Sequence, residues 1–249
     1  MKHYFQRITC NTNLDFIVQD QTILHFDQWR FIREESPWGN PPIVFDLSFL
    51  REMPTKEANS IAMREIPHAI ANLKRSNGPL PPVYLTSFDP KCDACQSIID
   101  FFNIRTKRGI SDFYLNITEK SYLVRQFLSS PMALFGRGYI CTMLEPSLFL
   151  FLQDLFPPQN LIYLSPDSRT DLTEYRDDDV MILGALIGKE TSGHTLTRAK
   201  QAGIRHARLP MRKVLGFTTA LNIDACLPIL NDFRNTRDWF YSFRWIPPR

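Results

Sequence analysis

The sequence predicts an α/β protein with a mostly parallel sheet, and three observations lead to this fold class. First, Val180–Ile187 is an uncharged apolar run interrupted by Gly184, which is typical of a strand buried on both faces. Second, a polar loop with glycines, a short helix and another strand follow this run, which makes a β–α–β unit. Third, a strand–helix–strand pattern already occurs between Ile43 and Ser87.

Length and composition are those of a globular protein. The chain has 249 residues, 44% of them apolar and 22% charged, with a net charge of +3. This length suffices for a substantial core in one large or two small domains. No uninterrupted apolar run reaches the roughly 18 residues that a membrane span needs, so we expect no membrane-spanning helix.

The five cysteines, an odd number, do not indicate a disulfide scaffold. Cys92 and Cys95 form a CDAC motif, which suits zinc or redox chemistry. The sequence has no second CxxC or CxxH pair to complete four zinc ligands, so we predict no metal site. The favoured interpretation is a pair of reduced thiols at the start of a helix.

Residues 1–40 are predicted to be an N-terminal extension. Its first fourteen residues contain basic but no acidic side chains, which is compatible with a mitochondrial presequence, although the Arg-rich and Ser-rich character of such leaders is missing. Its aromatic residues predict that the segment docks on the chain's own core or on a partner: Phe26, Trp29, Phe31 and Trp38.

The second predicted region, residues 41–249, is a single α/β domain. Its first strand is Ile43–Phe49, with Asp46 inside it, and its second strand is Pro82–Ser87. A further buried strand is predicted at Leu161–Ser165.

Two helices and a short strand are predicted between these strands. Thr55 caps a helix whose apolar residues keep helical spacing as far as Leu73. Pro67 lies inside this pattern and should kink or split the helix. A second helix is predicted at Cys95–Phe102 and a short strand at Phe113–Ile117.

An acidic run precedes the central strand, and we interpret it as a solvated helix face: Asp171, Glu174, Asp177, Asp178 and Asp179. After the central strand, Thr195 or Thr197 is the expected N-cap of a helix that ends near Gly203. Ile204–Leu209 is the next expected strand, stopped by Pro210. Ligands of such sheets bind beyond the carboxyl ends of the strands.

The end of the chain is predicted to form a closing helix from Val214 to Phe233, weakened in its middle by Pro228. An aromatic cluster follows and is expected to pack this helix on the sheet, with RNA stacking as the less favoured interpretation: Trp239, Phe240, Tyr241, Phe243 and Trp245.

One stretch, Thr191–Ile223, contains no acidic residue. Its six basic side chains suit a phosphate backbone, and an ordinary solvated helix face is the alternative that the residues alone leave equally open. They are Arg198, Lys200, Arg205, Arg208, Arg212 and Lys213.

Five short motifs occur in a fixed order: YLSPDS at 163–168, ILGALI at 182–187, LP at 209–210, RKVL at 212–215 and TRDW at 236–239. Together they resemble the tRNA methyltransferase family that modifies N1 of the purine at tRNA position 9, a family of the SPOUT superfamily. The resemblance covers about residues 41–249. The short motif TEKSY at Thr118–Tyr122 is similar to the mitochondrial branch.

The resemblance implies a SPOUT-type, Rossmann-like sheet with a C-terminal trefoil knot. It also implies S-adenosylmethionine as the cofactor and tRNA or pre-tRNA as the substrate, bound by the basic residues named above. The mitochondrial members work in the matrix with a short-chain dehydrogenase subunit and a nuclease subunit of ribonuclease P; the cytoplasm or nucleus is the alternative location. The implied cofactor contacts are Leu164, Gly184, Leu209, Pro210, Leu215 and Thr218.

The chain departs from the family pattern at the expected site of catalysis. Gly188 occupies the position of the family's aspartate, and Glu190, two residues on, is a weak substitute. Guanine N1 carries a proton that a base must remove, whereas adenine N1 offers a lone pair. The connection between LP and RKVL is also shorter than in the family, and Thr218 replaces an asparagine. These departures predict weak or absent methyl transfer.

An apolar segment at about residues 123–154 is a further departure, because family members pass almost directly to the next strand. It is either a surface for a partner or translated intron of a faulty gene model. Three functions therefore stay open: a tRNA-holding subunit of ribonuclease P, an active methyltransferase that favours adenine or guanine, and an inactive paralogue.

Overall fold

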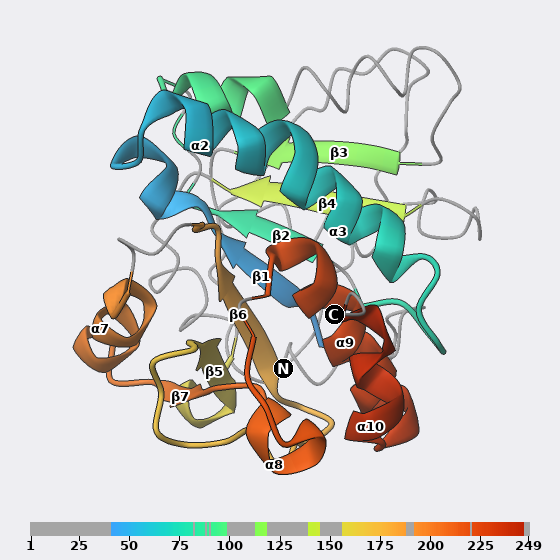
Figure 1. Cartoon of the computed structure of the whole chain (residues 1–249). Coiled ribbons are helices and arrows are strands. Elements are labelled where there is room, and N and C mark those ends of the chain that lie inside the picture. Colours follow the sequence, from blue (N-terminus) through green and yellow to red (C-terminus); the bar gives the residue numbers. More distant parts are fainter. Residues whose placement is uncertain are drawn as a thin grey trace, which may run out of the picture.

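The computed structural model of the chain describes residues 41–81, 83–87, 89, 91–98, 113–118, 139–144, 156–187, 192–219 and 221–246. Its strands form one sheet in the order β3-β4-β2-β1-β6-β5-β7, and every neighbouring pair is parallel (Figure 1). The predicted parallel α/β architecture is thus confirmed. The strands are β1 (Ile43–Asp46), β2 (Val83–Thr86), β3 (Phe113–Thr118), β4 (Tyr139–Leu144), β5 (Leu161–Leu164), β6 (Val180–Gly184) and β7 (Arg205–Ala207).

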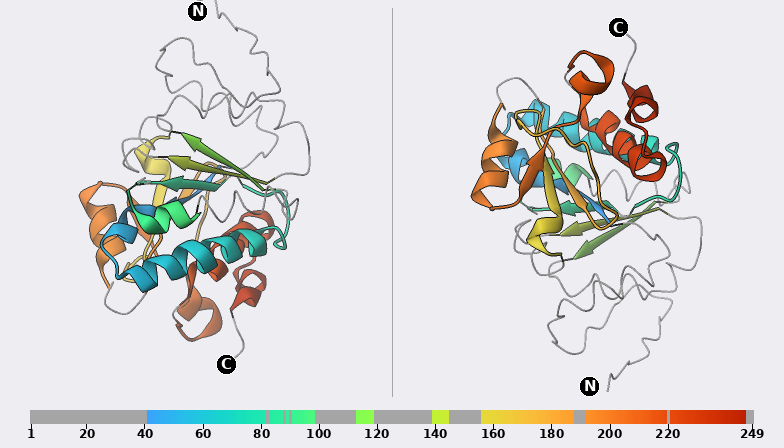
Figure 2. Two further views of the ribbon diagram at one scale, coloured as in Figure 1. Left: turned by 90° about the horizontal axis from the view of Figure 1, so that it is seen from above. Right: turned by 90° about the horizontal axis from the view of Figure 1, so that it is seen from below.

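Helices cover both faces of this sheet. On one face α3 (Ile66–Leu73) and α9 (Ile223–Thr236) lie side by side in both views of Figure 2. On the other face α7 (His194–Gln201) contacts β5 and β7. The short helices α8 (Met211–Leu215) and α10 (Trp239–Ser242) flank α9 in the chain.

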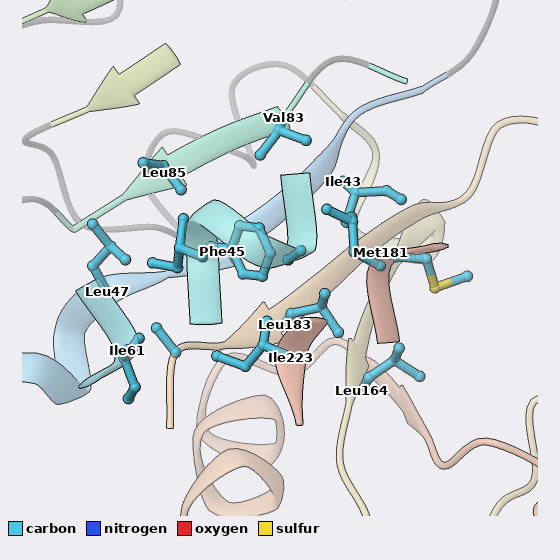
Figure 3. Close-up of a cluster of buried hydrophobic side chains, with 14 of the residues drawn as sticks. Ile43, Phe45, Leu47, Ile61, Val83, Leu85, Leu164, Met181, Leu183 and Ile223 are labelled. Carbon is cyan, nitrogen blue, oxygen red and sulfur yellow. The ribbon is translucent and has the colours of Figure 1, made fainter. Parts of the chain in front are cut away.

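Successive strand residues face two different cores, as the pleat requires. Ile43 and Phe45 of β1 belong to the larger core beneath α3 and α9, which Figure 3 shows, whereas Val44 belongs to the smaller core beneath α7. All three side chains are fully buried. Burial on both faces explains why β1, β2, β5 and β6 are apolar runs without alternation.

Two strands end earlier than predicted. β1 stops at Asp46 because this carboxylate accepts the backbone N–H of Ser48 at 3.1 Å and begins a 3₁₀ turn, η1 (Leu47–Arg51). β6 stops at Gly184, which lies opposite Asp46 in the register, and the last bond between the strands joins the N–H of Ala185 to the carbonyl of Asp46 at 2.9 Å. The pairing of β1 with β6 ends at this point.

Pro67 does not break the first helical segment. α2 (Thr55–Ser60) continues through a π-helical turn, η2 (Ile61–Glu65), into α3. In this turn the N–H of Ile66 bonds to the carbonyl of Ile61, five residues back. The wider turn accommodates the proline ring and its missing donor, so the predicted kink becomes a π-helical turn.

The predicted N-cap of α7 is wrong. Gly193 precedes the helix with a φ of +80°, a left-handed conformation that favours glycine. The hydroxyl of Thr195 instead donates to the Ser165 side chain at 2.8 Å. It therefore joins the helix to the end of β5.

The predicted closing helix is divided. α8 ends at Gly216, whose φ is +78°, and α9 begins only at Ile223. Pro228 lies within α9 and cannot donate to the carbonyl of Asp224, four residues back. The side-chain amide of Asn72 on α3 donates to that carbonyl at 3.2 Å and replaces the lost bond.

The acidic run forms no helix. Asp179 is fully buried and pairs with Arg176 at 3.1 Å and with Arg205 at 2.6 Å. Asp171 pairs with Arg208 at 2.6 Å, and the two residues bridge their chain segments. The prediction of a solvated helix face is wrong because no helix forms, and because Asp171 and Asp179 neutralise Arg208 and Arg205 from a later part of the chain.

The aromatic cluster packs on α9, not on the sheet. The ring of Trp239 stacks on Phe233 with centroids 3.7 Å apart and also faces Phe243 at 5.5 Å. Trp245 donates its indole N–H to Asp232 at 2.7 Å. Phe240 points outward, with 73% of its surface exposed.

Several predictions concern residues outside the described ranges. These are the docking of residues 1–40, most of the segment at 123–154, and the helix beyond residue 98; its part at 93–98 is helical as expected. β4 lies within the segment predicted to be an insert and pairs with β3 and β2. None of the described helices is long and apolar enough to cross a membrane, and no described group of three His, Cys, Asp or Glu side chains is placed to hold a metal ion.

Candidate functional site at the carboxyl edge of the sheet

Four neighbouring strands end together at one edge of the sheet. Asp46 of β1 lies opposite Gly184 of β6, and Leu164 of β5 lies between Leu183 of β6 and Ala207 of β7. β2 and β6 flank β1 on opposite sides, so the strand order changes direction there. Ligands of open parallel sheets bind at such a point, beyond the carboxyl ends of the strands.

A buried carboxylate occupies the centre of this edge. Asp46 is fully buried, and its Oδ2 accepts the hydroxyl of Tyr163 at 2.9 Å and lies 2.7 Å from Nε of Arg198. Burial, together with the Asp46 charge, raises the pKa of Tyr163 well above its usual value, so the phenol keeps its proton. A buried carboxylate with these partners anchors the site and is not placed to take a proton from a substrate.

A second set of polar contacts holds the start of α7. The carboxylate of Asp167 accepts the backbone N–H of Gly193 at 2.7 Å and the hydroxyl of Ser192 at 3.0 Å. The Thr195–Ser165 bond lies beside it. The residues that follow β5 therefore fix Ser192 and Gly193, which directly precede α7.

Gly184 has a packing role. A Cβ built on it would lie 2.7 Å from Cγ2 of Thr195 and 3.2 Å from both Phe49 Cε2 and the hydroxyl of Tyr163. The missing side chain lets α7 approach the sheet. The space is filled by the protein itself.

The structure brings most of the predicted cofactor residues together. Leu164 and Gly184 end adjacent strands, and Leu209 and Ile187 lie partly buried against the same core. Pro210 and Leu215 follow directly, at the start and end of α8. Thr218 is exposed beyond α8, and Gly188 and Glu190 lie outside the described residues.

The six predicted RNA-binding residues fall into two groups. Arg198, Arg205 and Arg208 each pair with a carboxylate, as described above. The other three residues are exposed, and within the described ranges they make no ion pair. They are Lys200 on α7 and Arg212 and Lys213 on α8.

The contributions of Tyr163, Ser165 and Asp167 were missed by sequence reasoning. Their signal was present, because all three belong to the YLSPDS motif, in which polar residues directly follow a buried strand. The same position after other strands is where parallel sheets place functional side chains.

The model of the family described as "tRNA (guanine(9)-N(1))-methyltransferase TRM10/TRM10A" matches residues 25–249. The chain belongs to this family. The TRM10 assignment confirms the resemblance that the five motifs indicated and places the fold among the SPOUT tRNA methyltransferases.

Three curated relatives illustrate the similarity of this TRM10-family chain. A Drosophila melanogaster mitochondrial ribonuclease P protein 1 homolog is 27% identical over 245 residues, covering 96% of this chain and 46% of the relative. A Danio rerio tRNA methyltransferase 10 homolog B is 34% identical over 44% of this chain and 37% of the relative. A Mus musculus tRNA methyltransferase 10 homolog C is 33% identical over 39% of this chain and 24% of the relative. The chain thus spans less than half the length of each.

Two solved structures share the fold. The full-length spTrm10 complex with SAH superimposes with a TM-score of 0.61 at 21% identity, over 83% of this chain and 94% of that one. A dual-specific Trm10 from Thermococcus kodakaraensis gives a TM-score of 0.51 at 15% identity, over 81% of this chain and 96% of that one.

Proposed function

We propose that this TRM10-family chain binds precursor tRNA as a subunit of a mitochondrial, protein-only ribonuclease P, and that its own methyl transfer is weak or lost. The observation that carries the proposal is the similarity to the fruit-fly ribonuclease P protein 1 homolog, which extends over 96% of this chain. Its partners are then a short-chain dehydrogenase subunit and a nuclease subunit, in the mitochondrial matrix; the cytoplasm or nucleus is the alternative.

The exposed basic residues support tRNA binding. Lys200, Arg212 and Lys213 lie on the two helices that precede and follow β7, without a carboxylate partner among the described residues. Each phosphate that such a side chain neutralises releases counterions and strengthens binding at low salt. Arg205 and Arg208 serve the fold through Asp179 and Asp171, so their part in RNA binding is secondary.

The charged groups at the sheet edge support weak methyl transfer. Removing the N1 proton of guanine calls for a general base, which contributes about 10²- to 10⁴-fold to a rate. Gly188 cannot act as one, and Asp46 and Asp167 are both occupied by internal donors.

The strand ends fit the adenosyl part of S-adenosylmethionine. Leu164, Leu209 and Leu215 would supply apolar surface, and Gly184 and Pro210 would supply backbone, whereas Thr218 is exposed beyond α8. The cofactor, when bound, would donate a methyl group from its sulfonium. These residues would bind and orient it, whereas the described carboxylates at this edge, Asp46 and Asp167, are already held by internal donors.

The inherited architecture belongs to the same proposal. The segment containing α8 and α9 would form the C-terminal trefoil knot, residues 41–249 the methyltransferase-like domain, and residues 1–40 an extension. The apolar segment at about 123–154 would then combine a structural strand, β4, with a partner surface.

Titration calorimetry with S-adenosylmethionine, with and without a mitochondrial pre-tRNA, separates the possibilities. We expect tRNA binding whose affinity falls steeply with salt, and cleavage of the 5′ leader when the dehydrogenase and nuclease subunits are added. Lys213→Glu should weaken tRNA binding, whereas Lys56→Glu on α2, far from α8 in Figure 1, should not. Equal effects of both variants would contradict the assigned surface.

An active methyltransferase acting on adenine is the second candidate. It is favoured by the retained strand-end geometry and by the fact that adenine N1 needs no base. Mass spectrometry of position 9 in adenine-9 and guanine-9 tRNAs tests it. Gly188→Asp should then raise guanine methylation. Absence of both tRNA and cofactor binding would indicate an inactive paralogue or a faulty gene model.

A further inference from the structure

A cleft of about 560 Å³ lies on the side of the sheet where β1 and β2 end, away from β5 and β7. The turn Leu47–Arg51 forms one wall, and the start of the helix at residues 93–98 forms the other. Arg51 pairs with Asp89 across the cleft. Cys92 lines it and is half-buried, whereas Cys95 is 1% exposed and belongs to the larger core.

The backbone places the two thiols on one face of the helix. The carbonyl of Cys92 accepts the N–H of Gln96 at 3.0 Å, so Cys92 opens the first helical turn and Cys95 lies one turn on. In helical geometry, Cα atoms three residues apart are about 5 Å from each other. A disulfide spans roughly 4.4–6.8 Å between Cα atoms. The Cys92 side chain already lies within hydrogen-bonding reach of the Cys95 thiol.

We propose that Cys92 and Cys95 form a reversible dithiol–disulfide pair that exchanges with small-molecule disulfides entering through the cleft. No described His, Asp or Glu joins the two sulfurs in a set that could hold a metal ion. A redox pair therefore suits the motif better than a zinc site does. This proposal is independent of tRNA binding and of methyl transfer.

The exchange balances as two thiol–disulfide steps. Cys92 loses its proton to solvent, and the thiolate attacks one sulfur of a disulfide such as oxidised glutathione, which releases one thiolate that takes up a proton. Cys95 then loses its proton and attacks the Cys92 sulfur of the mixed disulfide, which releases the second small thiol. Two electrons and two protons pass from the protein to the small molecule.

The two cysteines differ in their roles. Burial raises the pKa of Cys95 to about 12, so its thiolate is rare at neutral pH, and the side chain is shielded from disulfides in solvent. The thiolate is the nucleophile in exchange, and access limits its reaction. Cys92 at the cleft is therefore the entry point, and Cys95 resolves the mixed disulfide from within the core.

The test equilibrates the full-length protein with reduced and oxidised glutathione, alkylates the free thiols after acid denaturation, and analyses the tryptic peptide at residues 92–105. Trypsin cuts after Lys91 and Arg105, so both cysteines lie in one peptide. We expect a peptide without alkyl groups, two hydrogen masses lighter than the unmodified dithiol peptide, that grows with the proportion of oxidised glutathione and is replaced by the doubly alkylated peptide on reduction. Cys226, in a separate peptide, serves as the internal control and should remain alkylated.

Single variants test the asymmetry. Cys95→Ser should accumulate a glutathione adduct at Cys92, at least about tenfold more than Cys92→Ser accumulates at Cys95. Cys226→Ser should behave as the parent protein. Circular dichroism checks that each variant is folded. A pair that stays fully reduced in oxidised glutathione, or equal adducts in the two variants, would overturn the proposal.

Discussion

The ion pair between Arg198 and Asp46 offers a quantitative test of the site. In Arg198→Met the apolar stem is retained, while Asp46 loses its only cationic partner among the described residues and stays fully buried. Removing one partner of a buried pair costs about 3–5 kcal/mol. Asp46 keeps its bonds from Tyr163 and Ser48, and the Arg198 side chain is 28% exposed, so we expect about 3 kcal/mol.

Urea unfolding followed by circular dichroism measures this loss. Asp46→Asn should also destabilise, but the double variant should lose less than the sum of the single losses, by at least about 1 kcal/mol. Arg205→Met is the matched control: its side chain is 42% exposed, and Asp179 keeps Arg176. It should cost only about 1 kcal/mol. Additive losses at Arg198 and Asp46, or equal losses at Arg198 and Arg205, would refute the reasoning.

Three further predictions concern stability. Gly184→Ala should lower the free energy of unfolding in urea by about 2 kcal/mol, because its new methyl group overpacks against α7. Adding Thr195→Ser to this variant removes the clashing methyl group and should restore most of the loss. Absence of this rescue would contradict the contact. Burial raises the pKa of Glu65, so the folded state binds this proton more tightly than the unfolded state does. The stability of the fold therefore falls as the pH rises from the unfolded pKa through the folded pKa. Glu65→Gln should raise the melting temperature at pH 7, with no gain at pH 4. Trp239→Ala should lower the free energy of unfolding by about 3 kcal/mol, because its stacking on Phe233 is lost. Phe240→Ala should be nearly neutral, because Phe240 is exposed. Equal shifts in melting temperature for the two variants would argue against the packing of α10.

Local sequence patterns predicted β1, β2, β5 and β6 well because these strands are short, apolar and buried, whereas β4 was not predicted as a strand. β2, β3 and β5 fall within one residue of the predicted ends. The same patterns located the carboxyl edge, since parallel strands that alternate with helices must end together. The ends of β1 and β6 were predicted too far along the chain, because a strand stops where its neighbour stops.

The partners of charged residues were beyond prediction. The segments that hold Arg205 and Arg208 meet the acidic run only after the sheet has formed, so nothing in the local sequence identifies their carboxylates. The basic stretch therefore looked like one RNA surface, although half of its side chains serve internal ion pairs. The position of β4 between β3 and β2 also depends on contacts between distant parts of the chain, because hydrophobic spacing does not determine the order of strands in a sheet.

The buried guanidinium of Arg234 has a consequence for synthesis on the ribosome. It donates to the carbonyl of Pro41 at 2.6 Å and to that of Asp179 at 2.8 Å, and thereby ties α9 to the first described residue and to the start of β6. Its bond to Pro41 spans 193 positions of the chain. Contacts so distant form late. The part of this face that α9 covers therefore stays open on the nascent chain until α9 emerges, and this interval is when a chaperone has most to protect.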